Sequence, residues 1–504
     1  MQPFEIHDRL MYRRQFVLGP RPVACFPAYN SFRVGDHFHL TAHADLNTVH
    51  TVEGNRSLTL LGFILDPRHP NADDSRILKQ LMPELCSDSH PMDFLQTLNV
   101  YGGRWILIAN NGSRITVCND ALGQRPLYYT PRLANGEVWC GAQPGIIGSL
   151  LALEPSRLAM EFLDAQKRSG QQEYWFPNDI SGYDDIRLLL PNHYLDLTTA
   201  QSHRFWPSTL LKKLSLRHAV REGAKQLRGL MLSAANRFPL AVLMTAGWDS
   251  RSVLAAGKNL KTEVSYFTCD LGNGKTAAAD ISVPARLLYK LGKAHRVLNV
   301  PESMDPEFKQ LYLQNVAMAH ECMGPTAQAL FEFLGSSEVR VSGSGSETVR
   351  QQFRPSRWHA VTAETLASFA WTKERFAIEA FGQWLEGIPK DTGFHILDLF
   401  YWEQKCGQWL AVGQVEWDLV GESFAPFNCR ELLSTLLSTH VAYRVEPHYE
   451  LYRALLKELW PEVLAEPINP HKKPRTDSTS LKDKVRDILV KSHLIEFVRS
   501  GRKY

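Results

Sequence analysis

The sequence lacks three features that would point directly to a class of protein. None of its eight cysteines belongs to a Cys-x-x-Cys pair, which excludes the usual structural zinc spacing and a small disulfide scaffold. No run of about 18 uncharged apolar residues occurs, so no membrane-spanning helix is predicted. The N-terminus has no basic stretch followed by an apolar run, so no signal peptide is indicated. We therefore expect a cytoplasmic protein with reduced thiols.

The net charge is also small. The 56 Lys and Arg residues nearly balance 53 Asp and Glu residues, which leaves +3 over 504 residues. This balance predicts neither nucleic acid nor an anionic membrane as a partner. What is present is ordinary globular composition, with 44% hydrophobic and 22% charged residues. The length suggests roughly two to four domains.

The first two hundred residues read as rich in antiparallel strands. Strands are predicted at 38–43, 58–65, 105–109 and 115–118, and helices at about 74–85 and 145–168. Asn111-Gly112 predicts a hairpin between the last two strands, because both residues tolerate positive φ. We expect this part, residues 1–205, to form one domain.

From about residue 215 the pattern changes to alternating strands and helices. Strands are predicted at 240–244, 264–268 and 338–341, and helices at 217–236, from 250 to 257, and at 279–292. This succession predicts a parallel sheet with crossover helices. Beyond about 360 the chain reads as mostly helical. Residues 206–504 are therefore expected to form a second, α/β domain with a helical extension.

One loop in the second domain carries recognisable chemistry. Thr245-Ala246-Gly247-Trp248-Asp249-Ser250-Arg251 follows an apolar strand and precedes a helix, where an open parallel sheet places its ligand. Small residues there let backbone N–H groups face an anion such as pyrophosphate. Asp249 is unfavourable beside phosphates unless it binds a cation, which suggests Mg²⁺. The alternative is an ordinary strand–helix turn with Asp249 as the N-cap. Gly274-Lys275-Thr276 has the ending of a Walker loop, but Cys269 stands where its first glycine belongs.

The run 245–251 resembles the Ser-Gly-Gly-x-Asp-Ser loop of the ATP pyrophosphatase superfamily, with Thr245 for the first serine and Ala246 for the first glycine. Further segments are similar, in the same order, to the synthetase half of glutamine-dependent asparagine synthetases and their relatives. They are 280–286, 291–295, 341–347, 425–430 and 471–474. In the first half, 103–107 and 119–129 resemble the glutaminase domain of the same family.

The resemblance implies a fold and a set of site residues. It implies stacked antiparallel sheets in an αββα, Ntn-hydrolase-like domain, followed by a parallel-sheet domain of the adenine nucleotide α-hydrolase type. ATP and Mg²⁺ are the implied cofactors. The implied nucleotide contacts are Met244, Thr245, Ala246, Gly247, Trp248, Asp249, Ser250, Arg251, Thr268, Gly343, Ser344 and Gly345. Asp249 and Glu347 are the implied Mg²⁺ ligands, and Glu347, Lys472 and Lys473 the implied catalytic residues.

The sequence departs from the family pattern in both halves. The family's glutaminase uses a cysteine at the mature N-terminus, whereas this chain begins Met1-Gln2-Pro3 and its first cysteine is Cys25. We therefore expect glutamine hydrolysis to be lost. Ser344 replaces a glutamate and Glu347 an aspartate of asparagine synthetases, so the acid is not expected to be aspartate. Arg350 and Arg354 are candidates for binding an acidic substrate, or else part of a solvated face.

The expected function is an ATP-dependent ligase that adenylates a carboxylate, releases pyrophosphate and transfers the acyl group to an amine. The partners are then a small-molecule or peptide carboxylate and an amine or ammonia, with a separate glutaminase or an amine inside the substrate as open sources. β-Lactam synthetases, lasso-peptide cyclases and enzymes that amidate sugar uronic acids are branches with related departures. A homodimer stays open.

Three alternatives stay open at this point. The site of a superfamily member can adenylate a nucleobase carbonyl instead, although only the C-terminal tail is basic here. A decayed site would make the chain a non-catalytic regulatory or scaffold protein. His37, His39 and His43 with Asp45 allow a metal site, or else satisfied and exposed histidines.

Overall fold

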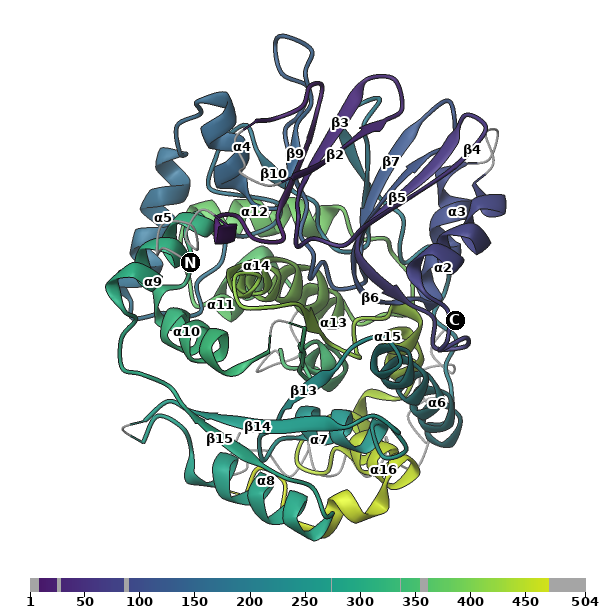
Figure 1. Ribbon diagram of the computed structural model, residues 1–504, viewed down its shortest axis with the longest axis vertical. Coiled ribbons are helices and arrows are strands. Elements are labelled where there is room, and N and C mark those ends of the chain that lie inside the picture. Colours follow the sequence, from purple (N-terminus) through teal and green to yellow (C-terminus); the bar gives the residue numbers. More distant parts are fainter. Residues whose placement is uncertain are drawn as a thin grey trace, which may run out of the picture.

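The computed structural model describes residues 9–24, 29–85, 90–272, 274–335, 337–353 and 361–470. In this part of the chain, two six-stranded antiparallel sheets precede a five-stranded parallel sheet. Figure 1 shows the antiparallel sheets at one end of the molecule and the parallel strands at the other. The prediction of two kinds of sheet in this order is confirmed, while the boundary at 205/206 stays a prediction.

The first antiparallel sheet has the strand order β10-β8-β9-β1-β3-β2. Its strands are β1 Phe16–Gly19, β2 Tyr29–Val34, β3 Phe38–His43, β8 Tyr128–Tyr129, β9 Cys140–Gly141 and β10 Arg187–Leu188. The second has the order β12-β11-β7-β6-β5-β4. Its strands are β4 Thr48–Glu53, β5 Arg56–Leu65, β6 Gly102–Asn110, β7 Ile115–Asn119, β11 His193–Asp196 and β12 Gln201–Arg204. The predicted hairpin is β6–β7, and Gly112 has a φ of 91°.

The two antiparallel sheets pack face to face. Leu18 and Leu40 of the first sheet share a buried core with Ile106 of the second. Because side chains alternate along a strand, Val17 and Leu107 point to the outer faces, where helices cover them. Helices α2 (Asp74–Leu81) and α3 (Pro91–Thr97) lie beside the second sheet, and α4 (Pro144–Leu151) and α5 (Arg157–Arg168) beside the first.

The prediction of one helix over 145–168 is wrong, because two helices occupy it. Helix α4 ends at Leu151, and its C-cap, Ala152, adopts a left-handed conformation with φ 50°. Pro155 follows, and a proline disfavours helical backbone in the residue before it. Ser156 then caps the next helix by accepting the N–H of Ala159.

The parallel sheet has the strand order β15-β14-β13-β16-β17. Its strands are β13 Leu240–Leu243, β14 Val264–Asp270, β15 Arg296–Asn299, β16 Val339–Val341 and β17 Ser423–Phe424. The helices before and between them are α6 Leu216–Ala235, α7 Trp248–Ala256, α8 Ala278–Lys290, α9 Pro306–Asn315 and α10 Gly324–Phe333. From β13 the chain builds to one side through β14 and later to the other through β16. The carboxyl ends of β13 and β16 therefore flank the switch point of the sheet.

The last part of the described chain is helical, as predicted, apart from β17. It comprises α11 Ala363–Phe369, α12 Arg375–Glu386, α13 Ile396–Phe400, a π-helical stretch Tyr401–Leu410, α14 Ala411–Trp417, α15 Arg430–Leu437 and α16 Glu450–Leu459. Short 3-10 turns are η1 Met82–Glu84, η2 Leu98–Val100, η3 Glu321–Met323, η4 Ser346–Arg350, η6 Val441–Tyr443 and η7 Pro461–Ala465. Helices α13 and α14 lie between the antiparallel and parallel sheets (Figure 1). None of the helices in the described ranges is long and apolar enough to cross a membrane.

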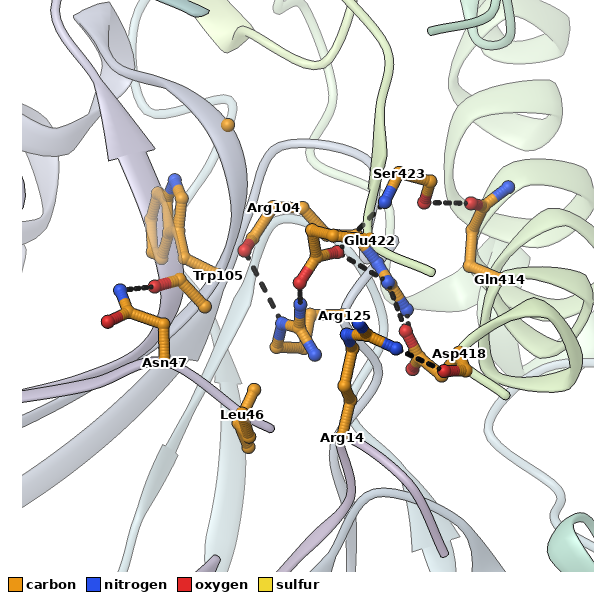
Figure 2. Close-up of polar contacts among 12 residues, drawn as sticks. Arg14, Leu46, Asn47, Arg104, Trp105, Arg125, Gln414, Asp418, Glu422 and Ser423 are labelled. Atoms are coloured by element: carbon orange, nitrogen blue, oxygen red, sulfur yellow. Dashed lines mark hydrogen bonds and ion pairs between the residues drawn. The ribbon is translucent and has the colours of Figure 1, made fainter. Parts of the chain in front are cut away.

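A buried network of charges joins the two kinds of sheet (Figure 2). Arg104 of β6, which is 0% exposed, donates to Asp418 and to Glu422 at 2.8 Å each. Arg125 donates to the other oxygen of Glu422 at 2.6 Å, and Arg14 donates to the carbonyl of Asp418 at 2.8 Å. Three arginines from the N-terminal half thus converge on the two acidic residues that precede β17. This fixes the antiparallel sheets against the edge of the parallel sheet.

Candidate functional site

Two loops meet at the switch point of the parallel sheet. The first loop, residues 244–247, connects β13 to α7. The second loop, residues 342–350, follows β16 and includes η4. Gly343 packs directly on Asp249, so that an added Cβ would lie 2.5 Å from the backbone carbonyl carbon of Asp249. Gly345 has a φ of 86°, which favours glycine. The two glycines predicted for the second loop are therefore required by close approach and by backbone conformation.

The first loop is held together by its own hydroxyl groups. The N–H of Thr245 donates to Ser250 Oγ at 3.1 Å, and the N–H of Gly247 donates to Thr245 Oγ1 at 3.2 Å. The N–H of Ala246 donates to Asp280 at 2.9 Å, so this carboxylate fixes the loop from α8. Three N–H groups of the loop are thus engaged within the protein.

The N-terminus of α7 remains as the anion-facing feature of this loop. Gly247 is its N-cap, and within the described residues no side chain caps the helix. The first N–H groups of a helix have no intrahelical partner and form the positive end of its dipole. The alternative with Asp249 as the N-cap is wrong, since Asp249 is the second residue of α7 and its side chain turns to the second loop.

Asp249 is bound by two residues of the second loop. Arg350 Nη2 donates to Asp249 Oδ2 at 2.6 Å, and the Ser346 hydroxyl donates to Oδ1. The same Nη2 lies 3.8 Å from Glu347 Oε1. Arg350 is 8% exposed, and its guanidinium lies over the ring of Tyr452 with 5.9 Å to the centroid. A single buried cation therefore stands between the two carboxylates predicted to bind Mg²⁺.

The environment of Glu347 disfavours its charged form. Burial and the negative charge of Asp249 raise the pKa of Glu347 to about 7, although Arg350 acts in the opposite direction. The described residues include no group of three or more His, Cys, Asp or Glu side chains that could hold a metal by themselves. Two carboxylates nevertheless fit Mg²⁺, which takes one or two of them together with phosphate oxygens and water. The carboxylates of Asp249 and Glu347 are thus of the ligand type that Mg²⁺ prefers, but Arg350 already binds that of Asp249.

A pocket of about 260 Å³ opens beside the first loop. Its walls include Phe267, Leu330 and Trp417, with Thr245 and Asp280 at the loop side. The residues of the Walker-like ending, Lys275 and Thr276, line it as well. A mostly apolar pocket with a few polar groups is typical of a site for a small molecule.

Polar groups at the base of this pocket are fixed by neighbours. The Thr268 hydroxyl donates to the carbonyl of Met244 at 2.8 Å and lies 2.9 Å from His295 Nε2. The guanidinium of Arg340 lies over the Trp417 ring, 4.0 Å from its centroid. Burial lowers the pKa of Arg340 to about 10. These groups form a rigid base for a ligand.

The structure brings most of the predicted site residues together, but gives two of them supporting roles. Trp248 is 3% exposed and packs on Tyr449 and Tyr452, at ring distances of 5.6 and 6.1 Å. Arg251 is fully buried and donates to the carbonyls of Val463 and Glu466. It thus anchors the C-terminal segment to α7. A position within a motif does not reveal where the side chain points.

The predicted catalytic lysines, Lys472 and Lys473, lie outside the described residues, as does Arg354. The described chain ends close to the site, since the N–H of Asn469 donates to the carbonyl of Ala246 at 3.0 Å.

Sequence reasoning missed several contributors to the site. Asp280 was noticed only as the first residue of a matching segment, and its bond to Ala246 shows its role. Arg340 lies on a predicted strand, where its charge could have signalled a function. Trp417 had no signal, because nothing in the sequence relates it to a loop 170 residues earlier.

The histidine cluster gives no metal site in the described chain. His43 Nε2 lies 3.0 Å from the carbonyl oxygen of Arg9, and His43 Nδ1 accepts the N–H of Asp45 at 3.0 Å. His43 therefore fixes a local turn.

The segments that resemble a glutaminase domain form an interface. Asp120 accepts N–H bonds from Gln124 and Arg125 at 2.8 and 2.9 Å, which closes the turn after β7. Asn428, in the second half, accepts the N–H of Leu122 at 2.8 Å and donates to the carbonyl of Gly103 at 2.7 Å. Segments 103–107, 119–129 and 425–430, which were picked out separately in the sequence, thus meet in space.

Comparisons with known proteins assign no family. No protein-family model matches the sequence, and no curated protein matches it. A structure of glutamine phosphoribosylpyrophosphate (PRPP) amidotransferase from B. subtilis, complexed with ADP and GMP, covers 69% of this chain and 73% of its own at 9% identity and a TM-score of 0.23. A structure of the allosteric regulatory enzyme of purine biosynthesis covers 62% and 75% at 11% identity and a TM-score of 0.23. Scores this low support no conclusion about function, so the case for this site rests on its own geometry.

Proposed function

We propose that the protein is an ATP-dependent ligase that activates a carboxylate as its acyl-adenylate and transfers the acyl group to an amine. One observation carries the proposal. At the switch point of a parallel sheet, the uncapped N-terminus of α7 meets two carboxylates, Asp249 and Glu347, beside a pocket for a small molecule. This combination suits a nucleoside triphosphate better than a neutral ligand.

Different parts of the site suit the base and the phosphates of the nucleotide. The apolar walls at Phe267 and Trp417 suit a flat aromatic base. The N-terminus of α7, with the hydroxyls of Thr245 and Ser250, suits the phosphates. Both hydroxyls already pair with each other at 3.1 Å, so they are held in place before a ligand arrives.

Asp249 and Glu347 would hold the divalent cation. Mg²⁺ bound there would offset the negative charge of the pyrophosphate leaving group. Glu347 contributes its carboxylate fully only when deprotonated, and its raised pKa opposes that form. Lys472 or Lys473 is proposed to stabilise the charge that develops as the amine attacks. The bond from Asn469 to Ala246 supports this assignment, because it ties the chain three residues before Lys472 to the first loop.

The ligase is proposed to lack a glutaminase activity of its own. Among the described residues of the antiparallel sheets, the free thiols are Cys118 and Cys140, and both are buried. Burial raises the pKa of Cys118 to about 12 and raises that of Cys140 further. A thiol that stays protonated is a poor nucleophile. Cys25 and Cys86 lie outside the described residues. We propose that the amine is free ammonia, ammonia from a separate glutaminase, or an amine within the substrate, as in a lactam cyclase.

A second candidate function is favoured by one contact. Arg350 forms an ion pair with Asp249, the predicted metal ligand. A non-catalytic regulatory or scaffold protein would tolerate this pair, because it needs no metal at Asp249.

Pyrophosphate release separates the two candidates. The assay offers Mg²⁺·ATP, ammonium and a panel of carboxylic acids to the wild type and to Asp249→Ala. The ligase predicts acid-dependent release in the wild type and its loss in the variant. Acid-dependent release that survives unchanged in Asp249→Ala would remove the site from this proposal, and no release by the wild type with any acid would favour the non-catalytic candidate.

A further inference from the structure

Arg350 contacts Asp249, a carboxylate that the resemblance assigns to Mg²⁺. Its Nη2 donates to Asp249 Oδ2 at 2.6 Å and lies 3.8 Å from Glu347 Oε1. The segment 341–347 resembles a family loop, but the resemblance assigns no role to an arginine three residues after Glu347. The contact thus adds a cation of the chain itself to a site predicted for Mg²⁺.

Arg350 and an inner-shell metal would compete for the carboxylate of Asp249. Its Oδ1 accepts from Ser346 and its Oδ2 from Arg350, so each oxygen already has a close donor. Mg²⁺ binds a carboxylate oxygen at about 2.0–2.1 Å and requires near-octahedral geometry. A guanidinium on the same oxygen would be repelled by the ion at short range. In its present position Arg350 therefore opposes a metal ion at Oδ2, and its departure would favour metal binding.

The surroundings of Arg350 leave it able to take a new anion. Its Nε has no hydrogen-bond partner among the described residues, although the side chain is 8% exposed. A buried donor without an acceptor is unfavourable, so a ligand that supplies oxygen atoms would relieve it. The face of Tyr452 holds the guanidinium near the loops, and the Tyr452 hydroxyl donates to the carbonyl of Ser346 at 2.6 Å. Tyr452 thereby contacts both ends of η4, Ser346 and Arg350.

We propose that Arg350 is the resident cation of this site, which holds Asp249 until a divalent cation arrives with the nucleotide and then pairs with a phosphate of that nucleotide. The proposal rests on the proposed function. Arginine suits the second role, because its planar fork binds phosphate oxygens through two parallel hydrogen bonds. The exchange keeps both carboxylates and the guanidinium paired before and after binding.

The exchange makes two predictions of opposite sign for Arg350→Gln. Without nucleotide, Mn²⁺ should bind the variant about tenfold more tightly than the wild type, because its competitor is gone. Metal·ATP should bind the variant about tenfold more weakly, because a phosphate partner is gone. Arg350→Lys keeps the positive charge but not the planar guanidinium, and its two affinities should lie between those of the wild type and Arg350→Gln. Arg375→Gln on α12, whose side chain is 90% exposed, is the matched control and should change neither affinity.

Calorimetric titration of the full chain with Mn²⁺ alone, and then with Mg²⁺ and the non-cleavable analogue α,β-methylene-ATP, measures both affinities. Both affinities of Arg350→Gln within twofold of the wild type would overturn the exchange. Far-UV circular dichroism and the unfolding midpoint identify a variant that fails to fold.

A crystal structure of the wild type with Mg²⁺ and the analogue tests the exchange without any variant. The exchange predicts that Arg350 contacts a phosphate oxygen and no longer contacts Asp249. An intact 2.6 Å pair beside bound nucleotide would overturn it while leaving the ligase proposal in place. Failure of the wild type to bind metal·nucleotide at millimolar concentration would overturn the proposed function itself.

Discussion

Arg104 Nη2 donates to Asp418 Oδ2 at 2.8 Å, and both side chains are buried where β6 meets the segment that joins α14 to β17. The two residues are 314 positions apart in the chain. Glu422 also accepts hydrogen bonds from Arg104 and from Arg125. Burial alone would raise the pKa of Glu422, but the positive charges of these arginines lower it to about 2. The halves of the chain are thus joined by charges that are costly to leave unpaired.

Asp418→Asn should destabilise the protein by about 3 kcal/mol, because it leaves Arg104 buried with one carboxylate fewer. Urea unfolding followed by tryptophan fluorescence measures the loss. Glu161→Gln is the control, since it removes the exposed pair with Arg157 and should cost less than about 1 kcal/mol. Equal effects of the two substitutions would show that the buried network contributes nothing special.

His320 should make stability depend on pH. Its Nδ1 lies 2.7 Å from Glu416 Oε1 and its Nε2 lies 2.7 Å from the carbonyl of Tyr174, so both nitrogens face acceptors. Burial has the largest single effect and lowers the pKa of His320, and Lys405 adds to it. The hydrogen bonds to Glu416 and to the Tyr174 carbonyl, with the negative charge of Glu416, together outweigh them and raise the pKa. Because the folded pKa lies above the unfolded value of about 6.5, the stabilisation is complete below that value and is lost as pH rises through the folded pKa.

The measurement is the unfolding midpoint in urea between about pH 6 and pH 9. We expect the wild type to lose stability across this window and His320→Gln to show a flatter profile. The hydroxyl of Tyr312 and the backbone N–H of residue 320 also donate to Glu416, at 2.9 and 2.8 Å, so the carboxylate keeps two donors in the variant. Parallel profiles for the two proteins would contradict the assignment to His320.

Gly343→Ala should weaken nucleotide binding while the fold persists. The added Cβ would lie 2.5 Å from the carbonyl carbon and 2.6 Å from the Cβ of Asp249, so the two loops must separate. We expect the affinity for Mg²⁺·ATP to fall by at least about 1.4 kcal/mol, which is tenfold. Gly413→Ala is the control, because its Cβ meets nothing within 4 Å in the described structure and replaces a glycine inside α14. That control should bind nucleotide normally, and a Gly343→Ala protein that does so too would contradict the site.

Glutamine should be an ineffective nitrogen source. The buried thiols Cys118 and Cys140 have raised pKa values, so no activated nucleophile is expected from them. Incubation of the protein with glutamine should release no glutamate above a heat-denatured control. Glutamate formation that is lost in Cys25→Ser would contradict the expectation and assign the nucleophile to Cys25.

Local features of the site were predictable from the sequence, whereas its long-range contacts were not. The strand β13, the turn at Gly247 and the helix α7 follow one another directly, so apolar periodicity and small residues reveal them. The ion pair of Asp249 with Arg350 joins residues 101 positions apart, and no local pattern encodes it. Arg251 shows the converse, since it belongs to the motif but donates to carbonyls more than 200 positions away.

The fold shows the same division. Strand β5 and the hairpin β6–β7 were predicted, because their apolar runs and turn are local. Strand β15 was missed, since its Arg296 and Val297 are exposed at the edge of the sheet. Strand β17 was missed because it has only two residues and forms through pairing with β16. Such pairing depends on the assembled sheet.

The central claim is that the switch-point loops bind ATP with a divalent cation. Calorimetric titration of the full chain with ATP in excess Mg²⁺, for the wild type and Asp249→Ala, tests it most directly. We predict a dissociation constant below about 1 mM for the wild type, within the range in which enzymes bind their substrates, and at least tenfold weaker binding for the variant. No binding by the wild type at millimolar ATP, or equal binding by the two proteins, would contradict the account.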